Sequence, residues 1–80
     1  MEVTVKLFAL LRSYAPPETL GYVFHWQLEE GSSIADLLSA LRIPPELAEL
    51  VLVNGAHSHP TERLHEGDVV SLFPALAGGS

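Results

Sequence analysis

The sequence predicts an α+β domain in which one main helix packs across a small mixed sheet. Residues 2–8 alternate between polar and apolar side chains, which is the period of a half-buried strand. Between residues 33 and 41, apolar residues recur at intervals of three and four, as on one face of a helix. Two apolar runs bounded by turn residues, at 50–53 and 69–73, predict further strands.

The first third of the chain predicts a short helix between two strands. Residues 9–15 are compatible with a helix and are followed by Pro16 and Pro17, which stop it after one or two turns. Between residues 22 and 28 the large side chains fall on alternate positions, so we expect a second strand there.

Local signals also mark the main helix and the turn after the third strand. Ser33 and Asp36 have the spacing of a capping box, and we expect the Pro44-Pro45 pair to end the helix and to open a short turn. Asn54-Gly55 predicts a tight turn in which both central residues have positive φ, and residues 56–60 are expected to form a brief return strand.

Composition limits the classes of function. Eighty residues, nearly half of them apolar, make one globular domain, which we place at 1–74 with a flexible C-terminal tail at 75–80. The absence of cysteine excludes disulfides, thiolate metal sites and cysteine nucleophiles. A net charge of −6 argues against nucleic acid as a partner and favours a basic protein surface. No apolar stretch is long enough for a membrane span, so we expect no membrane partner and a cytoplasmic location.

The sequence contains no catalytic or metal-binding pattern of its own. His57 and His59 stand on the same side of an extended segment, and His65 could supply a third ligand, but neither a cysteine nor a helical His-x-x-x-His pair accompanies them. We therefore expect a solvated loop and no metal site. No Gly-x-Ser-x-Gly elbow or phosphate-binding loop is present, so the chain is not expected to be an enzyme in its own right.

An apolar patch is expected on the sheet face away from the helix. If Leu7, Val70 and Leu72 face the helix, then strand alternation places Phe8, Val69 and Phe73 on the opposite side. These three residues predict a surface for docking a partner; the alternative is ordinary scatter of apolar side chains over a surface.

The C-terminal tail has the properties of a segment that enters a narrow channel. Pro74 cannot donate to a sheet ladder, and Gly78 and Gly79 contribute nothing to a packed core. Without a Cβ, the end of the tail can lie extended where other residues do not fit. The alternative is a flexible linker, which Gly-Gly-Ser also resembles.

Taken together, several motifs resemble those of the β-grasp sulfur carriers, whose nearest branch is the small subunit of molybdopterin synthase. The resemblance spans essentially the whole chain, and the Phe-Pro and Gly-Gly ending is its most specific part. It is carried by Lys6-Leu7-Phe8-Ala9 with Leu11-Arg12, by residues 31–38, by Val53-Asn54-Gly55, and by Gly67-Asp68 with Leu72-Phe73-Pro74 and Ala77-Gly78-Gly79.

The resemblance implies a ubiquitin-like fold and a role for the tail. An E1-like adenylating enzyme would use ATP to activate the carboxylate of Gly79, which would then become a thiocarboxylate. Pro74, Leu76, Ala77 and Gly78 would lie in the partner's channel. The large subunit of molybdopterin synthase would take the sulfur for molybdopterin, and the carrier itself would bind no cofactor.

Ser80 departs from the family pattern, in which the second glycine is terminal. It is either an appended residue, or removed by a peptidase before activation, or the mark of an inactive copy. Other functions compatible with the resemblance are a carrier for tRNA thiolation, cysteine or thiamine synthesis, and a ubiquitin-like protein modifier. A non-catalytic β-grasp interaction module is the alternative of a different class.

Overall fold

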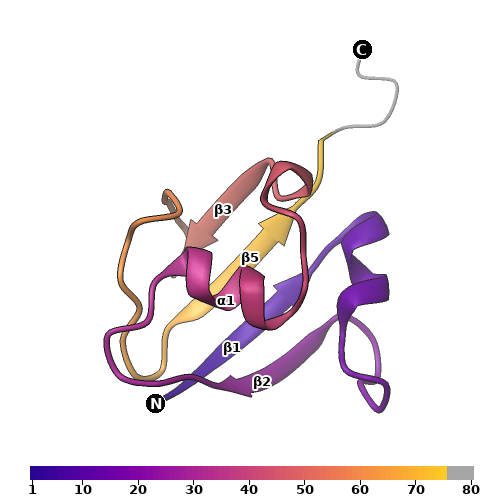
Figure 1. The fold of residues 1–80 in the computed structure, drawn as a ribbon. Coiled ribbons are helices and arrows are strands. Elements are labelled where there is room, and N and C mark those ends of the chain that lie inside the picture. The colour runs from indigo at the N-terminus through magenta and orange to yellow at the C-terminus, as the bar shows by residue number, and fades with distance from the viewer. Residues whose placement is uncertain (76–80) are drawn as a thin grey trace.

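A computed structural model describes residues 1–75, which form one five-stranded sheet with a helix on one of its faces (Figure 1). The strand order is β2-β1-β5-β3-β4, so the first and last strands of the chain are neighbours in the middle of the sheet. Leu76, Ala77, Gly78, Gly79 and Ser80 lie outside the described residues. The strands are β1 (Glu2–Leu7), β2 (Val23–Gln27), β3 (Leu50–Val53), β4 (Ala56–His57) and β5 (Val69–Phe73).

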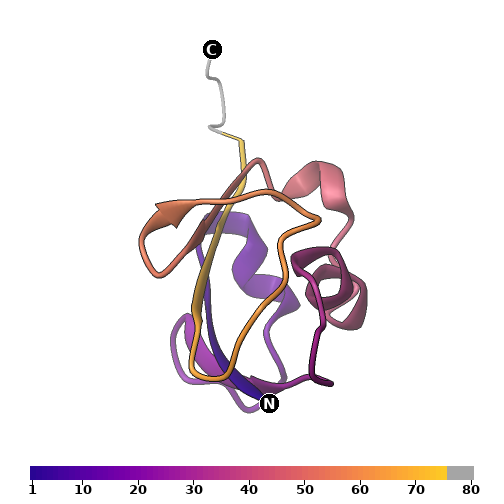
Figure 2. The same ribbon diagram turned by 90° about the vertical axis from the view of Figure 1, so that its left-hand side faces the viewer.

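The sheet is mixed because β1 and β5 run parallel, whereas the other neighbouring strands are antiparallel. Leu7 is in register with Leu72, and Val5 with Val70. Seen after a 90° turn, the sheet and the main helix form two layers, with the helix on one side only (Figure 2). The predicted α+β class and the mixed sheet with one main helix are confirmed.

The main helix, α1 (Ile34–Ala40), begins as the sequence predicts. Ser33 lies at the N-cap, and its Oγ accepts from the backbone N–H of Asp36 at 3.2 Å, while the Asp36 carboxylate accepts from the Ser33 N–H at 2.9 Å. The two bonds satisfy backbone groups that a helix start leaves without intrahelical partners.

The end of α1 has a different cause from the one predicted. The helix ends at Ala40, ahead of the Pro44-Pro45 pair, because the chain turns through Arg42 with φ of 62°. The Ile43 N–H donates to the Leu38 carbonyl at 2.9 Å and the Arg42 N–H to the Ser39 carbonyl at 3.1 Å. This is the bond pattern of a Schellman motif, with arginine in the left-handed position that glycine usually occupies.

Two 3-10 helices flank the end of the sheet where the chain leaves β5 (Figure 1). The first, η1 (Ala9–Tyr14), is the short helix predicted after the first strand. The second, η2 (Pro45–Leu47), has proline at its first position, where the missing N–H costs no intrahelical bond.

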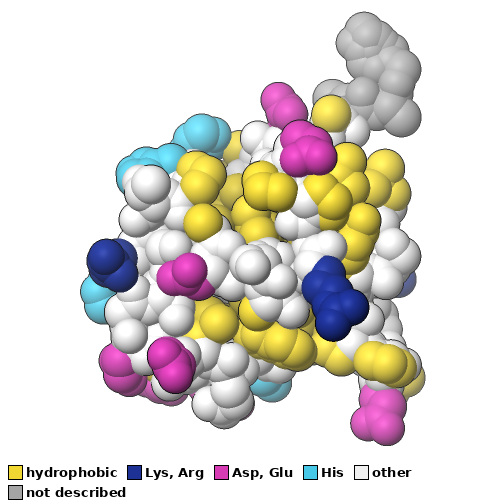
Figure 3. All heavy atoms as spheres, viewed as in Figure 1, with side chains coloured by type: hydrophobic (Ala, Val, Ile, Leu, Met, Phe, Trp, Pro, Cys, Tyr) yellow, Lys and Arg dark blue, Asp and Glu magenta, His cyan; other side chains and the backbone are white. Residues whose placement is uncertain are grey.

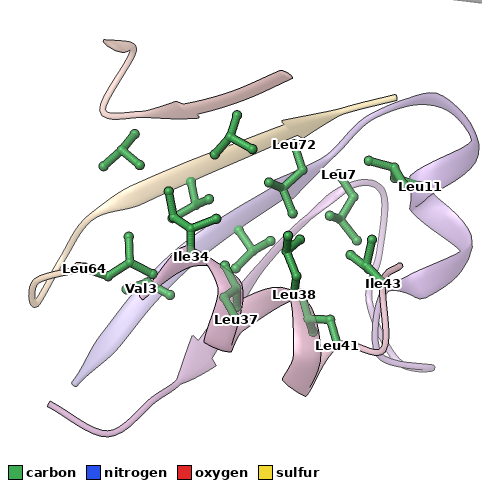
Figure 4. Close-up of a cluster of buried hydrophobic side chains, with 14 of the residues drawn as sticks. Val3, Leu7, Leu11, Ile34, Leu37, Leu38, Leu41, Ile43, Leu64 and Leu72 are labelled. Atoms are coloured by element: carbon green, nitrogen blue, oxygen red, sulfur yellow. The ribbon is translucent and has the colours of Figure 1, made fainter. Parts of the chain in front are cut away.

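The core lies between α1 and the facing side of the sheet (Figure 4). Along β1, Val3, Val5 and Leu7 are fully buried, and the helix contributes Ile34, Leu37 and Leu38. The apolar side chains of the helix and those of the strand therefore pack together in one layer. No buried side-chain N or O atom among residues 1–75 lacks a hydrogen-bond partner.

The Asn54-Gly55 turn is as predicted, with φ of 52° and 84° at its two residues. The return strand that follows, β4, covers only Ala56–His57 and is shorter than the predicted segment 56–60. Asn54 also fixes the start of β5, because its side chain accepts from the Val69 N–H at 2.9 Å and donates to Asp68 at 2.9 Å.

Candidate docking face and tail root

The sheet face away from α1 is here called the outer face. Within residues 1–75, no helix packs on it (Figure 2). Its residues alternate with the buried ones, so Thr4, Lys6 and Phe8 lie on it from β1 and the residue that follows. All three are half-buried, as are Val69 and Phe73 on β5 and the two leucines Leu50 and Leu52 on β3.

An aromatic cluster of Phe8, Phe73 and Tyr22 lies at the end of the outer face. The rings of Phe8 and Phe73 are stacked, with centroids 4.2 Å apart and planes inclined by 7°. Tyr22 packs on Phe8 at 5.1 Å with a tilt of 48°, and 42% of its surface is exposed. The structure thus brings together two of the three residues that the sequence placed in a docking patch.

Val69 lies on the same face but at the opposite end of β5. It is in register with Thr4, four residues before Phe73. At about 3.3 Å per residue, the two β5 side chains are about 13 Å apart along the strand. The predicted patch is therefore a stripe that runs the length of β5, and it does not form one cluster.

Sequence reasoning missed two groups on this face. The run from Leu50 to Val53 was predicted as a buried strand, yet Leu50 and Leu52 face outward, and Leu50 is in register with Phe73. Tyr22 precedes β2 and was treated only as a strand residue. The pairing of β3 with β5 places alternate residues of β3 next to the aromatic cluster, and no local sequence pattern specifies that pairing.

The tail leaves the sheet directly beside the aromatic cluster. The Phe8 N–H donates to the Leu72 carbonyl at 3.1 Å, and this bond extends the β1–β5 pairing towards the end of β5. Pro74 is half-buried and Ala75 is exposed. The predicted tail-binding residues Leu76, Ala77 and Gly78, and the predicted attachment residue Gly79, follow outside the described range.

The histidines do not converge. The His59 imidazole lies 2.8 Å from the Thr61 hydroxyl, and the His65 imidazole lies 3.8 Å from the Asp68 carboxylate. Within residues 1–75 no three His, Asp or Glu side chains are placed to hold one metal ion.

A shallow hollow of about 460 Å³ lies between the loop at 16–20 and residues 23–25 of β2. Glu18 and His25 are the titratable residues that line it, and no serine or cysteine accompanies them. Its lining therefore offers no serine or cysteine nucleophile.

The side of the molecule that carries α1 is different in character. Figure 3 shows acidic and basic side chains at separate places among apolar ones, with acidic side chains beside the point where the grey segment begins. The tail root, residues 74 and 75, therefore lies between acidic side chains on this side and the aromatic cluster on the outer face.

The fold and the site together define a class of protein: a ubiquitin-like β-grasp domain whose last strand delivers a C-terminal tail. The chain belongs to the ThiS family, whose model matches residues 5–79. The match thus ends at the second glycine of the Gly-Gly pair. The predicted membership of the β-grasp sulfur carriers is confirmed.

Solved structures agree with this assignment. SAMP1 of Haloferax volcanii is similar over 99% of this chain and 100% of its own, with 26% identity and a TM-score of 0.73. A Pyrococcus furiosus protein assigned provisionally as molybdopterin converting factor subunit 1 matches with 27% identity and a TM-score of 0.70, covering 94% and 98% of the two chains.

A third structure, from Helicobacter pylori 26695, is a complex of subunits 1 and 2 of molybdopterin-converting factor. It matches over 99% of this chain and 100% of its own, with 24% identity and a TM-score of 0.59. At this identity the match supports the fold alone. No curated protein matches the chain in sequence. Among residues 1–75, no helix has the length and apolar character that crossing a membrane requires.

Proposed function

We propose that this chain is the sulfur-carrying small subunit of a molybdopterin synthase. Its C-terminal glycine, Gly79, is adenylated by an E1-like enzyme with ATP and then thiocarboxylated, and the large subunit accepts the sulfur into molybdopterin. The chain binds no cofactor itself and acts as a co-substrate in the cytoplasm, without catalytic activity of its own.

The observation that carries this proposal is the position of the tail root. β5 ends between a stacked aromatic pair on the outer face and acidic side chains on the helix side, so one partner surface can bind the outer face and receive the tail at once. The ThiS family match through Gly79 supports the chemistry, and the similarity to a molybdopterin converting factor subunit 1 supports the pathway.

The division of labour follows from chemistry. A carboxylate is a poor electrophile, so adenylation supplies a leaving group, and sulfide then displaces AMP to give the thiocarboxylate. A persulfide that displaces AMP instead gives an acyl disulfide, which a thiol must reduce to release the thiocarboxylate. The partners' active sites hold the tail in line for these steps, so the carrier contributes position and not catalysis. Basic groups around the partner's channel would complement a carrier of charge −6.

The test is intact-mass analysis after incubation of the chain ending at Gly79 with an E1-like enzyme, ATP and a sulfur donor. Replacement of one oxygen by sulfur at Gly79, followed by its loss when large subunit and pterin precursor are added, is the expected result. Turnover of precursor by the isolated chain, or no sulfur transfer to the large subunit, would contradict the proposal.

A second function, that of a ubiquitin-like protein modifier, is favoured by the similarity to SAMP1, described as a small archaeal modifier protein. It uses the same activated Gly79 but transfers it to an amine. Covalent adducts of this chain on other proteins, found in cells by mass spectrometry, would favour it over sulfur transfer.

A further inference from the structure

The outer face carries one basic residue, Lys6, near its centre. The five strands contain a single acidic residue, Glu2, and a single Lys or Arg, Lys6, which is also the only lysine of the chain. Lys6 is in register with Val23 of β2 on one side and with Ser71 of β5 on the other. Because β1 has a neighbouring strand on each side, Lys6 lies in the interior of the sheet and not at an edge.

Apolar side chains surround this cation on several sides. Phe8 follows it along the chain on the same face, Val23 stands beside it, and Leu52 lies one strand further across, opposite Ser71. Lys6 itself is only half-buried, so its ammonium group reaches water while its alkyl stem covers part of the sheet.

No carboxylate of the described chain neutralises Lys6. Within residues 1–75 it forms no ion pair and its side chain makes no hydrogen bond. Glu2, on the same strand and face, is four residues away, about 13 Å along the strand, and accepts from Gln27 at 3.3 Å. His25 faces outward too, but its ring nitrogen is 3.3 Å from the Thr4 hydroxyl.

A partner that covers the outer face removes this ammonium from water. A charge buried without a counter-ion is strongly unfavourable, whereas a carboxylate in hydrogen-bonding reach offsets the desolvation. The outer face thus has the opposite sign at its centre from the rest of this acidic protein.

We propose that the protein that binds the outer face presents an Asp or Glu carboxylate to Lys6, surrounded by apolar side chains that contact Phe8, Phe73 and Leu52. The proposal rests on the proposed function for the identity of that protein, the large subunit of molybdopterin synthase. It adds one requirement for that protein: besides basic groups around the channel that receives the tail, it needs one acidic side chain opposite Lys6 on the outer face.

Affinity measurements with the cognate large subunit test this directly. Lys6→Met keeps the length of the stem and removes the charge, so a buried carboxylate on the partner loses its counter-ion and the affinity falls by about thirtyfold or more. Lys6→Arg retains most of the affinity. Lys6→Glu abolishes binding, and replacing the facing acidic residue of the large subunit by Lys restores it.

Arg42→Met is the matched control, since it removes the same charge at the end of α1, on the other side of the sheet. It should leave the affinity within about threefold of wild type, as expected for a charge outside an interface. Thermal unfolding of each variant confirms that the fold is retained.

Because Lys6 is the only lysine, amine labelling gives a second readout. An acylating reagent can modify only Lys6 and the N-terminal amine of Met1, which donates to the Leu28 carbonyl at 2.7 Å at the far end of the sheet. In the complex, labelling of Lys6 should fall strongly, while labelling of Met1 stays at the level measured for the free protein.

Equal or tighter binding by Lys6→Met, or equal labelling of Lys6 in the free and bound states, overturns this inference and leaves the proposed function intact if wild type still transfers sulfur. Absence of wild-type binding to the large subunit overturns both.

Discussion

Phe8 and Phe73, which stand at the ends of the first and last strands, form a stacked pair 4.2 Å apart at the point where the tail begins. Their contact depends on the parallel pairing of β1 and β5. The pair therefore joins the two neighbouring strands at the point where the chain leaves the sheet.

Phe73→Ala should weaken binding to the large subunit by about thirtyfold, since a buried aromatic anchor typically contributes about 2 kcal/mol or more. It should also lower the free energy of unfolding by about 1–2 kcal/mol, because the stack and part of the ring's burial are lost. Titration calorimetry and urea denaturation measure the two effects.

Trp26→Leu is the control for that variant. Trp26 packs edge-on against Phe24 on the helix side of the sheet, at 6.1 Å. Its replacement should lower stability while leaving affinity unchanged. If both variants lose affinity in proportion to stability, the outer face is not the docking surface.

Arg42→Gly should stabilise the protein by about 0.5–1 kcal/mol. Arg42 adopts φ of 62°, a conformation that is strained by about 1–2 kcal/mol in residues with a Cβ, and glycine removes the strain at some entropic cost. The measurement is the midpoint of urea denaturation at unchanged slope. Arg42→Ala removes the same charge but keeps the strain, so an equal gain from alanine would contradict the explanation.

Ser33→Ala should destabilise the protein by about 1 kcal/mol, because the Asp36 N–H loses its acceptor at the start of α1. Asp36→Ala removes the reciprocal bond to the Ser33 N–H. Since the two residues form one capping box, the double variant should cost less than the sum of the single ones in the same denaturation experiment. Strict additivity would show that the two bonds act independently.

Sequence patterns predicted the elements well where a local rule decides them. The capping box at Ser33, the Asn54-Gly55 turn and the alternation along β1 each follow from residue types a few positions apart. The predicted end of α1 at the Pro44-Pro45 pair was wrong, because no sequence pattern marks an arginine that adopts a left-handed conformation.

The site was predictable in part. Alternation placed Phe8 and Phe73 on one face, but their stacking depends on the register of two strands more than sixty residues apart along the chain. The outward leucines of β3 and the isolation of Lys6 likewise depend on strand order, which no local pattern specifies.

Gly79, the residue proposed to carry the sulfur, can be activated only if its carboxylate is free. In a chain that ends at Ser80, the group at Gly79 is a peptide carbonyl, which cannot form an acyl-adenylate. The free carboxylate is then one residue, about 3.5 Å, further along the channel and stands next to a side chain. Since a misplacement of about 1 Å can cost about a hundredfold in rate, the chain ending at Ser80 should be a very poor substrate of the activating enzyme.

A chain that ends at Gly79 should be activated rapidly, which intact-mass analysis detects as the replacement of one oxygen by sulfur. Gly79→Ala in that shorter chain is the matched test of channel width: it leaves the carboxylate in place and adds only a methyl group, which should again suppress the reaction. Phe73→Ala in the same background should slow activation only as far as it weakens docking. Equal rates of thiocarboxylation for chains ending at Ser80 and at Gly79 would show that the terminal-glycine mechanism does not apply to this protein.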